Sequence, residues 1–259
     1  MKLHLDKKTF KEFINKISSE NSIDLDILEK DYYVCCVLEE LSRKQEDLKA
    51  YFKGGTALYK ILDTTNRFSE DIDLTVKELP EENNTKNKKR LENSAFSYEI
   101  TGLELNKEES QKNKKTVTAI YKYKSVFEFG ENPLQRAEKI QIESTSFTVS
   151  EPVEEVVIEP IIYKMASEED KKILDKSFEV HKIKLQVIKL ERMFIDKIFA
   201  AEFYFIRNMY TDTAKHIYDI SVLLCNDKIK EFLKNEQEYK QLVEYKRQEE
   251  KVRKRRNRC

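Results

Sequence analysis

Residues 52–58 read FKGGTAL and residues 67–74 read RFSEDIDL, and these two stretches decide the fold class of the chain. The glycine pair predicts a tight turn that opens a helix, because glycine adopts backbone conformations that other residues avoid. The alternation of acidic and apolar residues from Asp71 to Val76 predicts a strand. A turn, a helix and a strand with polar side chains are therefore expected close together.

The glycine turn has the features of a phosphate-binding site. A helix that begins at Gly54 and Gly55 presents backbone N–H groups at the positive end of its dipole, where anions bind. The hydroxyl of Thr56 adds a donor, and Lys53 stands directly before the turn. Either stretch taken alone also fits an ordinary turn or a solvated strand edge. In combination they predict a nucleotide-binding cradle made of Lys53, Gly54, Gly55 and Thr56.

The acidic strand predicts a site for a divalent metal. Asp71 and Asp73 are two residues apart, so both carboxylates point to one face of the strand while Ile72 points into the core. Two magnesium ions need a further carboxylate, and Glu143 is the candidate, since it alternates with apolar neighbours in the same way. Two other residues remain open as the third ligand, namely Glu128 and Glu138.

The combined motif is similar to the signature of the DNA polymerase β-like nucleotidyltransferases, and in its detail it resembles the AbiEii-like toxin family. The stretch EKDYYV at residues 29–34 resembles the family's N-terminal helix. Residues 191–201 resemble its E-x(5)-K-x-x-A helix, and residues 215–220 resemble its R/K-D-x-Y-D helix. The resemblance covers roughly three quarters of the chain, from residue 29 to residue 220.

The resemblance implies Mg²⁺ or Mn²⁺ as the cofactor, a nucleoside triphosphate (NTP) as the substrate, and further site residues. Lys197 and Asp219 carry over as the family's lysine and carboxylate, and His216 stands where the family usually has an aspartate. Arg67 and Ser69 match the segment before the acidic strand, where they would contact the triphosphate or the metal, or serve only as local turn and surface residues. Lys197 shares a helical stripe with apolar residues, so an anionic partner is expected unless its ammonium group reaches solvent.

The wider pattern predicts an α+β protein, a mixed sheet flanked by helices and followed by a helical module. A helix is expected over residues 26–42, a solvated segment over 77–93, and helices again from 189 onward. The expected divisions are a nucleotidyltransferase core at 1–188, a helical module at 189–248 and a mobile basic tail at 249–259. Strands are expected at residues 97–105, 116–127, 140–149 and 183–188.

Composition constrains the surroundings more than the chemistry. The 48 basic and 48 acidic residues balance, so any binding to nucleic acid must be local. The stretch with the clearest positive charge is the end of the chain, which fits a solubilising tail and a grip on RNA phosphates equally well. Four cysteines without metal-site spacing suit a reducing cytoplasm, and no long apolar run predicts a membrane span.

The sequence therefore predicts a metal-dependent nucleotidyltransferase whose acceptor is RNA, such as tRNA. By resemblance it would be the toxin of a toxin–antitoxin or abortive-infection system, with an antitoxin encoded nearby. Transfer to a small molecule or a protein, and a non-catalytic nucleotide-binding role, are the alternatives. The retained acids and lysine favour an enzyme, while the basic tail favours RNA over a small molecule.

Overall fold

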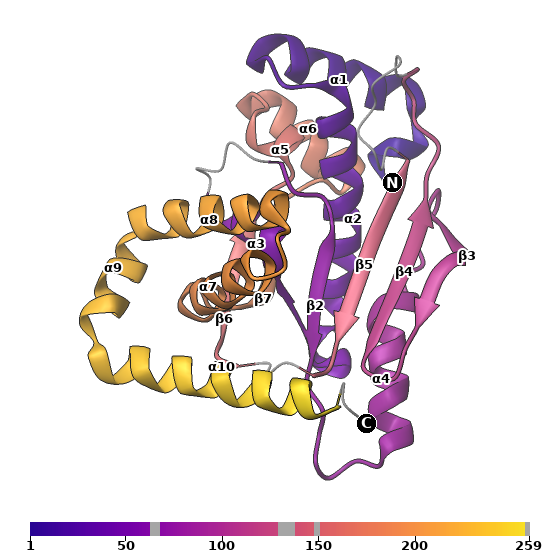
Figure 1. The fold of residues 1–259 in the computed structure, drawn as a ribbon. Helices are drawn as coiled ribbons and strands as arrows, with labels where there is room; N and C mark the ends of the chain where they lie inside the picture. The colour runs from indigo at the N-terminus through magenta and orange to yellow at the C-terminus, as the bar shows by residue number, and fades with distance from the viewer. Residues whose placement is uncertain (63–67, 129–137, 148–150, 257–259) are drawn as a thin grey trace.

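A mixed β-sheet organises the part of the chain that the structure describes (Figure 1). The structure is a computed structural model of the 259-residue chain, and it describes residues 1–62, 68–128, 138–147 and 151–256. Within these residues the strands are β1 (Ala50–Lys53), β2 (Ile72–Val76), β3 (Glu104–Lys112), β4 (Thr116–Lys122), β5 (Lys139–Thr145), β6 (Val153–Ile158) and β7 (Ile183–Ile188). Their order across the sheet is β3-β4-β5-β2-β1-β7-β6.

Helices cover the sheet and extend beyond it. The helices are α1 (Lys7–Asn21), α2 (Leu25–Leu48), α3 (Gly54–Leu62), α4 (Asn84–Phe96), α5 (Ile161–Lys164), α6 (Glu168–Phe178), α7 (Leu190–Phe205), α8 (Tyr210–Cys225), α9 (Asp227–Lys234) and α10 (Glu236–Arg256). The long helix α2 contacts β1, β5 and β7, and α4 contacts β2, β4 and β5, so both pack on the sheet. Helices α7 to α10 stand to one side of it (Figure 1). In the described residues, no helix combines the length and apolar character that a membrane span requires.

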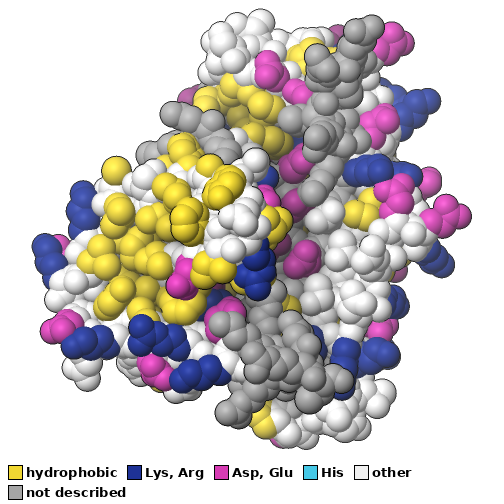
Figure 2. Space-filling view, in the orientation of Figure 1, with side chains coloured by type: hydrophobic (Ala, Val, Ile, Leu, Met, Phe, Trp, Pro, Cys, Tyr) yellow, Lys and Arg dark blue, Asp and Glu magenta, His cyan; other side chains and the backbone are white. Residues whose placement is uncertain are grey.

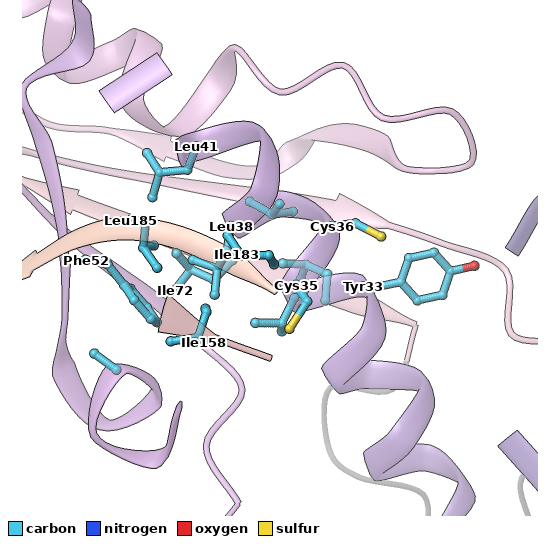
Figure 3. Close-up of a cluster of buried hydrophobic side chains, with 14 of the residues drawn as sticks. Tyr33, Cys35, Cys36, Leu38, Leu41, Phe52, Ile72, Ile158, Ile183 and Leu185 are labelled. Atoms are coloured by element: carbon cyan, nitrogen blue, oxygen red, sulfur yellow. The ribbon is translucent and has the colours of Figure 1, made fainter. Parts of the chain in front are cut away.

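The core lies between α2 and the middle of the sheet. Leu38 and Leu41 of α2 point toward Phe52, Ile72 and side chains of β6 and β7 (Figure 3). Six side chains of this core are at most 2% exposed, namely those of Leu38, Leu41, Phe52, Ile72, Ile158 and Leu185. Burial of such apolar surface is the main favourable contribution to folding, and here it fixes β1 and β2 against α2.

The central strands combine both pairing directions. β2 is antiparallel to β1 and parallel to β5, and β1 is parallel to β7. Because β2 and β5 are parallel, the segments that lead into them reach the sheet at the same end. This topology confirms the predicted mixed α+β fold, and it brings residues from three distant segments to one position on the sheet.

Ion pairs attach α10 to α7, which are the last and the first of the four helices beside the sheet. These four helices, α7 to α10, are the helical part of the protein. Arg192 of α7 is 1% exposed, and its Nη2 donates to both carboxylate oxygens of Glu249 in α10, at 2.8 and 2.6 Å. Lys246 lies 3.0 Å from Asp196 in the same region. Residues 249–256, which were predicted from the sequence as part of a basic tail, belong to the helix α10. Good helix-forming residues and the pair with Arg192 account for the difference.

Several predicted elements have other boundaries or other types. Residues 97–103 form no strand, and β3 lies further on in a polar segment without clear alternation. β6, α5 and α6 were not predicted, and part of the segment expected as solvated loop or helix is the helix α4. The helix predicted over residues 26–42 is α2, and the predicted strand at residues 183–188 is β7. Edge strands depend on their neighbours rather than on intrinsic pattern, which explains the missed ones.

Removal of the α10 carboxylate should destabilise the protein. We expect Glu249→Ala to lower the free energy of unfolding by about 3 kcal/mol, because it leaves the guanidinium of Arg192 buried with one partner fewer. Glu250→Ala is the matched control, since Glu250 is 23% exposed and lies 3.5 Å from Lys246. Urea unfolding of both variants measures the difference, and equal losses would mean that the Arg192 pair does not fix α10.

Candidate active site

A row of polar side chains crosses the centre of the sheet. Asp73 of β2 is the register partner of Lys53 in β1 on one side and of Glu143 in β5 on the other. Ile72, Leu74 and Ile142 alternate with these residues and are fully buried on the opposite face. The strand alternation that the sequence suggested therefore places Lys53, Asp73 and Glu143 side by side, although they are far apart in the chain.

Asp73 has the electrostatic environment of a metal ligand. Burial raises the pKa of its carboxyl group to about 6, and the negative charges of Glu143 and Asp71 raise it as well. The positive charges of Lys53 and Lys197 oppose this shift in the pKa. Asp71, Asp73 and Glu143 are thus close enough to repel one another, which a bound cation would relieve.

The glycine turn brings the backbone against this carboxylate. Gly54 has a φ of +85°, a conformation that residues with a side chain rarely adopt. A Cβ atom at this position would overlap the Oδ2 atom of Asp73. Only glycine therefore lets α3 start directly beside the acidic strand, and the N-terminal N–H groups of α3 lie next to the carboxylate.

Thr56 and Ser69 join the two motif segments. The hydroxyl of Thr56 donates to Oγ of Ser69 at 3.0 Å, and Thr56 is 1% exposed. Thr56 therefore holds the segment before β2 against the first turn of α3, a contact that the sequence did not suggest. Lys53 donates to the hydroxyl of Thr145 at 3.3 Å. Arg67 lies outside the described residues.

Lys197 and Asp219 meet across two helices, as the sequence predicted. Nζ of Lys197 in α7 lies 2.7 Å from Oδ2 of Asp219 in α8, and their side chains are 10% and 4% exposed. The charge of Lys197 also acts on Asp73, which places the pair beside the acidic strand. The ring of His216 stacks on Tyr204, with 5.2 Å between ring centroids.

A groove separates the helical part from the sheet, and acidic side chains gather along it (Figure 2). In the described residues, no three His, Cys, Asp or Glu side chains stand together closely enough to hold a metal ion by themselves. Mg²⁺ commonly takes one or two carboxylates from a protein and its remaining ligands from phosphates and water. The carboxylate oxygens of Asp71 and Asp73, with Glu143 adjacent, fit such a hard cation.

The other candidates for a third ligand lie elsewhere. Glu138 is exposed, and its carboxylate accepts from the N–H of Ser125 at 2.9 Å. Glu128 is exposed as well. Glu143 pairs in register with Asp73, and its charge raises the pKa of the Asp73 carboxyl group. The register of β5 therefore favours Glu143.

Several charged residues around the site were not predicted from the sequence. Asp196 is surrounded by Lys246, Arg192 and Lys53, whose charges lower the pKa of its carboxyl group against the opposing effect of burial. Lys30 of α2 is 1% exposed and lies 3.3 Å from Glu70, directly before Asp71. A signal for the buried charges of α2 was the run of three consecutive charged residues, Glu29 to Asp31, in a helix whose buried residues are mainly apolar.

A separate cavity of about 680 Å³ lies beside the end of α3. Its walls include Tyr59, Ile61 and Phe68, together with residues of β6 and α5. The acidic residues of β2 and β5 do not line it, so the chemistry inferred above does not depend on this cavity.

A glycine turn that opens a helix beside an acidic strand, in a mixed sheet, is typical of a nucleotidyltransferase. The chain belongs to the AbiEii family, since residues 36–257 match the family described as "Nucleotidyl transferase AbiEii toxin, Type IV TA system". Comparison with curated proteins gave no significant match.

Among solved structures, the chain is similar to MenT4, nucleotidyltransferase toxin Rv2826c from Mycobacterium tuberculosis H37Rv. The two are 18% identical with a TM-score of 0.46, and the match covers 71% of this chain and 56% of that chain. The chain thus spans little more than half the length of that toxin.

Substitution of the first glycine should disturb the acidic strand. We expect Gly54→Ala to lower the free energy of unfolding by about 2 kcal/mol, because a positive φ is strained for alanine and its Cβ displaces Asp73. Gly55→Ala is the control, since Gly55 is not among the residues with positive φ. Urea unfolding compares the variants, and equal stability of the two would contradict the close approach of Gly54 to Asp73.

The raised pKa of Asp73 predicts a pH-dependent destabilisation of the metal-free protein. A carboxyl group whose pKa rises from 3.8 to about 6 on folding destabilises the folded state above pH 6, and this effect disappears as the pH falls below 3.8. Asp73→Asn removes the charge and should therefore stabilise the protein at pH 7.5 by roughly 1 to 3 kcal/mol. The gain should vanish near pH 4. Urea unfolding at both pH values in EDTA tests this, and a gain that persists at pH 4 would exclude the charge as its cause.

Proposed function

We propose that this protein transfers a nucleotide from an NTP to a hydroxyl group of RNA, such as tRNA, with Mg²⁺ or Mn²⁺ bound at Asp71 and Asp73. The observation that carries the proposal is the row in which Asp73 stands between Lys53 and Glu143, with the start of α3 against it. Family membership supports the nucleotidyl transfer, and the donor set supports the metal.

Several residues of the site bind the triphosphate, each with a different group. Gly54 and Gly55 present the N-terminal N–H groups of α3 to the triphosphate, and Lys53 supplies a positive charge beside them. Lys197, held by Asp219, adds a second positive charge from the other side of the groove. Ser69 is oriented by Thr56 and stands just before the acids, where its hydroxyl can meet a phosphate oxygen.

The carboxylates orient the reacting groups. Asp71 and Asp73 hold the cation, and Glu143 adds negative charge to the same site. When bound, the metal lowers the pKa of the attacking hydroxyl and neutralises charge on the triphosphate. An in-line attack on the α-phosphate then forms the new phosphodiester bond, and pyrophosphate leaves.

RNA is the proposed acceptor because positive charge collects at one end of the chain. Arg253, Lys254, Arg255 and Arg256 end the helix α10. A helix with four consecutive basic residues suits phosphate backbones, and its effect should weaken with salt. We further propose that the protein acts in the cytoplasm as a growth-inhibiting toxin, as in abortive infection, and that a separately encoded antitoxin counteracts it, in keeping with the type IV family.

Labelled nucleotides test this proposal directly. The full chain is incubated with each α-labelled NTP and total RNA, in Mg²⁺, Mn²⁺ or EDTA, and label in RNA is measured on a gel. We expect transfer from at least one NTP in the presence of metal, and a loss of roughly 100-fold or more in Asp71→Ala. Asp227→Ala is the matched control, because Asp227 is an acid whose side chain is 93% exposed on α9.

Two results would contradict the proposal. Label in a small molecule or a protein, with none in RNA, would identify a different acceptor class. Near-normal transfer by Asp71→Ala, or in EDTA, would show that the carboxylates do not hold a required metal. Parallel reactions with a cell extract depleted of RNA distinguish these outcomes.

A further inference from the structure

Three consecutive charged residues are buried in α2 and hold three different segments. Glu29, Lys30 and Asp31 are at most 1% exposed. The carboxylate of Glu29 accepts from the backbone N–H of Val126 and from the hydroxyl of Ser125. Asp31 accepts from Lys60 of α3 and from the N–H that begins α5. Lys30, between them, contacts the segment before β2 and the first residue of β5.

Lys30 joins β5 to the segment before β2. Its Nζ lies 3.3 Å from Oε2 of Glu70, and it donates to the backbone carbonyl of Lys139, the first residue of β5. Oε2 of Glu70 is buried and has no hydrogen bond, so the ammonium group of Lys30 supplies its compensating charge. One side chain therefore links the two segments from the sheet face that α2 covers.

The pairing of β2 with β5 begins only at Ile72 and Ile142. Asp71 precedes this ladder, so the ladder hydrogen bonds do not fix its position. Glu70, its direct neighbour, is held by Lys30. At the other strand, Lys30 holds the first carbonyl of β5, four residues before Glu143.

We propose that Lys30 is a positioning residue that sets the separation of the metal-binding carboxylates, by fixing the segment before β2 to the start of β5. This inference rests on the proposed function, since it concerns the same metal site. Lys30 itself does not contact the metal or the nucleotide. Residues behind metal ligands orient them and affect metal affinity, and Lys30 has this role through Glu70 and the backbone of β5.

Lys60 offers a closely matched control. It is also a buried lysine, it pairs with a carboxylate, Asp31, and it donates to one backbone carbonyl, that of Glu159. Its side chain is 3% exposed, and that of Lys30 is 2% exposed. Its contacts, however, hold the end of α3 and the segment before α5 rather than the acidic strands. Both Lys30→Met and Lys60→Met remove a buried ion pair. Only Lys30→Met also removes contacts with the chain next to the proposed metal ligands.

The experiment compares Mn²⁺ affinity, hydrogen–deuterium exchange and urea unfolding in these variants of the full chain. We expect both variants to lose stability to a similar degree. Lys30→Met should weaken Mn²⁺ binding by about tenfold or more, and Lys60→Met by no more than about twofold. In the metal-free protein, Lys30→Met should raise exchange in residues 68–74 and 139–143, whereas Lys60→Met should raise it near the end of α3.

Glu70→Gln keeps the test decisive if Lys30→Met does not fold, because Glu70 is 20% exposed and its substitution retains the shape of the side chain. It should weaken Mn²⁺ binding in the same way, and addition of Lys30→Met should weaken it little further. Wild-type Mn²⁺ affinity in Glu70→Gln and Lys30→Met, or an equal loss in Lys60→Met, would overturn the inference. If Asp71→Ala bound Mn²⁺ as the wild type does, the proposed metal site itself would be overturned, which is a distinguishable result.

Discussion

The repulsion between carboxylates at the centre of the sheet is the constraint to which the surrounding structure responds. Asp73 is desolvated and lies near Asp71 and Glu143, so its charged form is unfavourable and the pKa of its carboxyl group rises to about 6. Such a group destabilises the metal-free fold at neutral pH. Lys53 in the neighbouring strand and Lys197 in α7 oppose that effect from two sides. The sheet can carry the acids because the apolar residues that alternate with them are packed on α2 and α4.

The face of the sheet away from the site offsets this destabilisation in two ways. Apolar side chains of α2 pack against Phe52, Ile72 and Leu185 (Figure 3). Buried charges of the same helix hold the segments that the sheet hydrogen bonds do not reach. A buried ion pair contributes little net stability compared with an apolar pair, but an unpaired partner is costly, so these contacts specify one arrangement rather than add much to folding. The positions of the site residues are therefore maintained by contacts on the opposite face of the sheet.

The sequence was sufficient for the parts of the site that depend on local pattern. Alternation in β2 and β5 predicted that Asp73 and Glu143 lie on the face away from the core, and the glycine pair predicted the turn before α3. It was insufficient where a contact joins distant segments by charge alone. Nothing in the pattern around Glu70 indicates a partner in α2, and nothing around Arg192 indicates Glu249, because opposite charges are abundant in this chain. The polar β3 was missed for a related reason, since its strand state depends on pairing with β4.

The pairing of Lys197 with Asp219 has a consequence for how the two halves of the site work together. An ammonium group that is 10% exposed needs an anion, and Asp219 provides it at 2.7 Å. The pair thereby orients the lysine in the groove, so its side chain is ordered before any ligand binds. The charge of Lys197 also acts on Asp73 across the groove, so α7 contributes to the electrostatics of the acidic strand. The helices α7 to α10 are then a component of the site and not merely a cover for the sheet. Because α10 is paired with α7 through Arg192, it also supports the helix that carries Lys197.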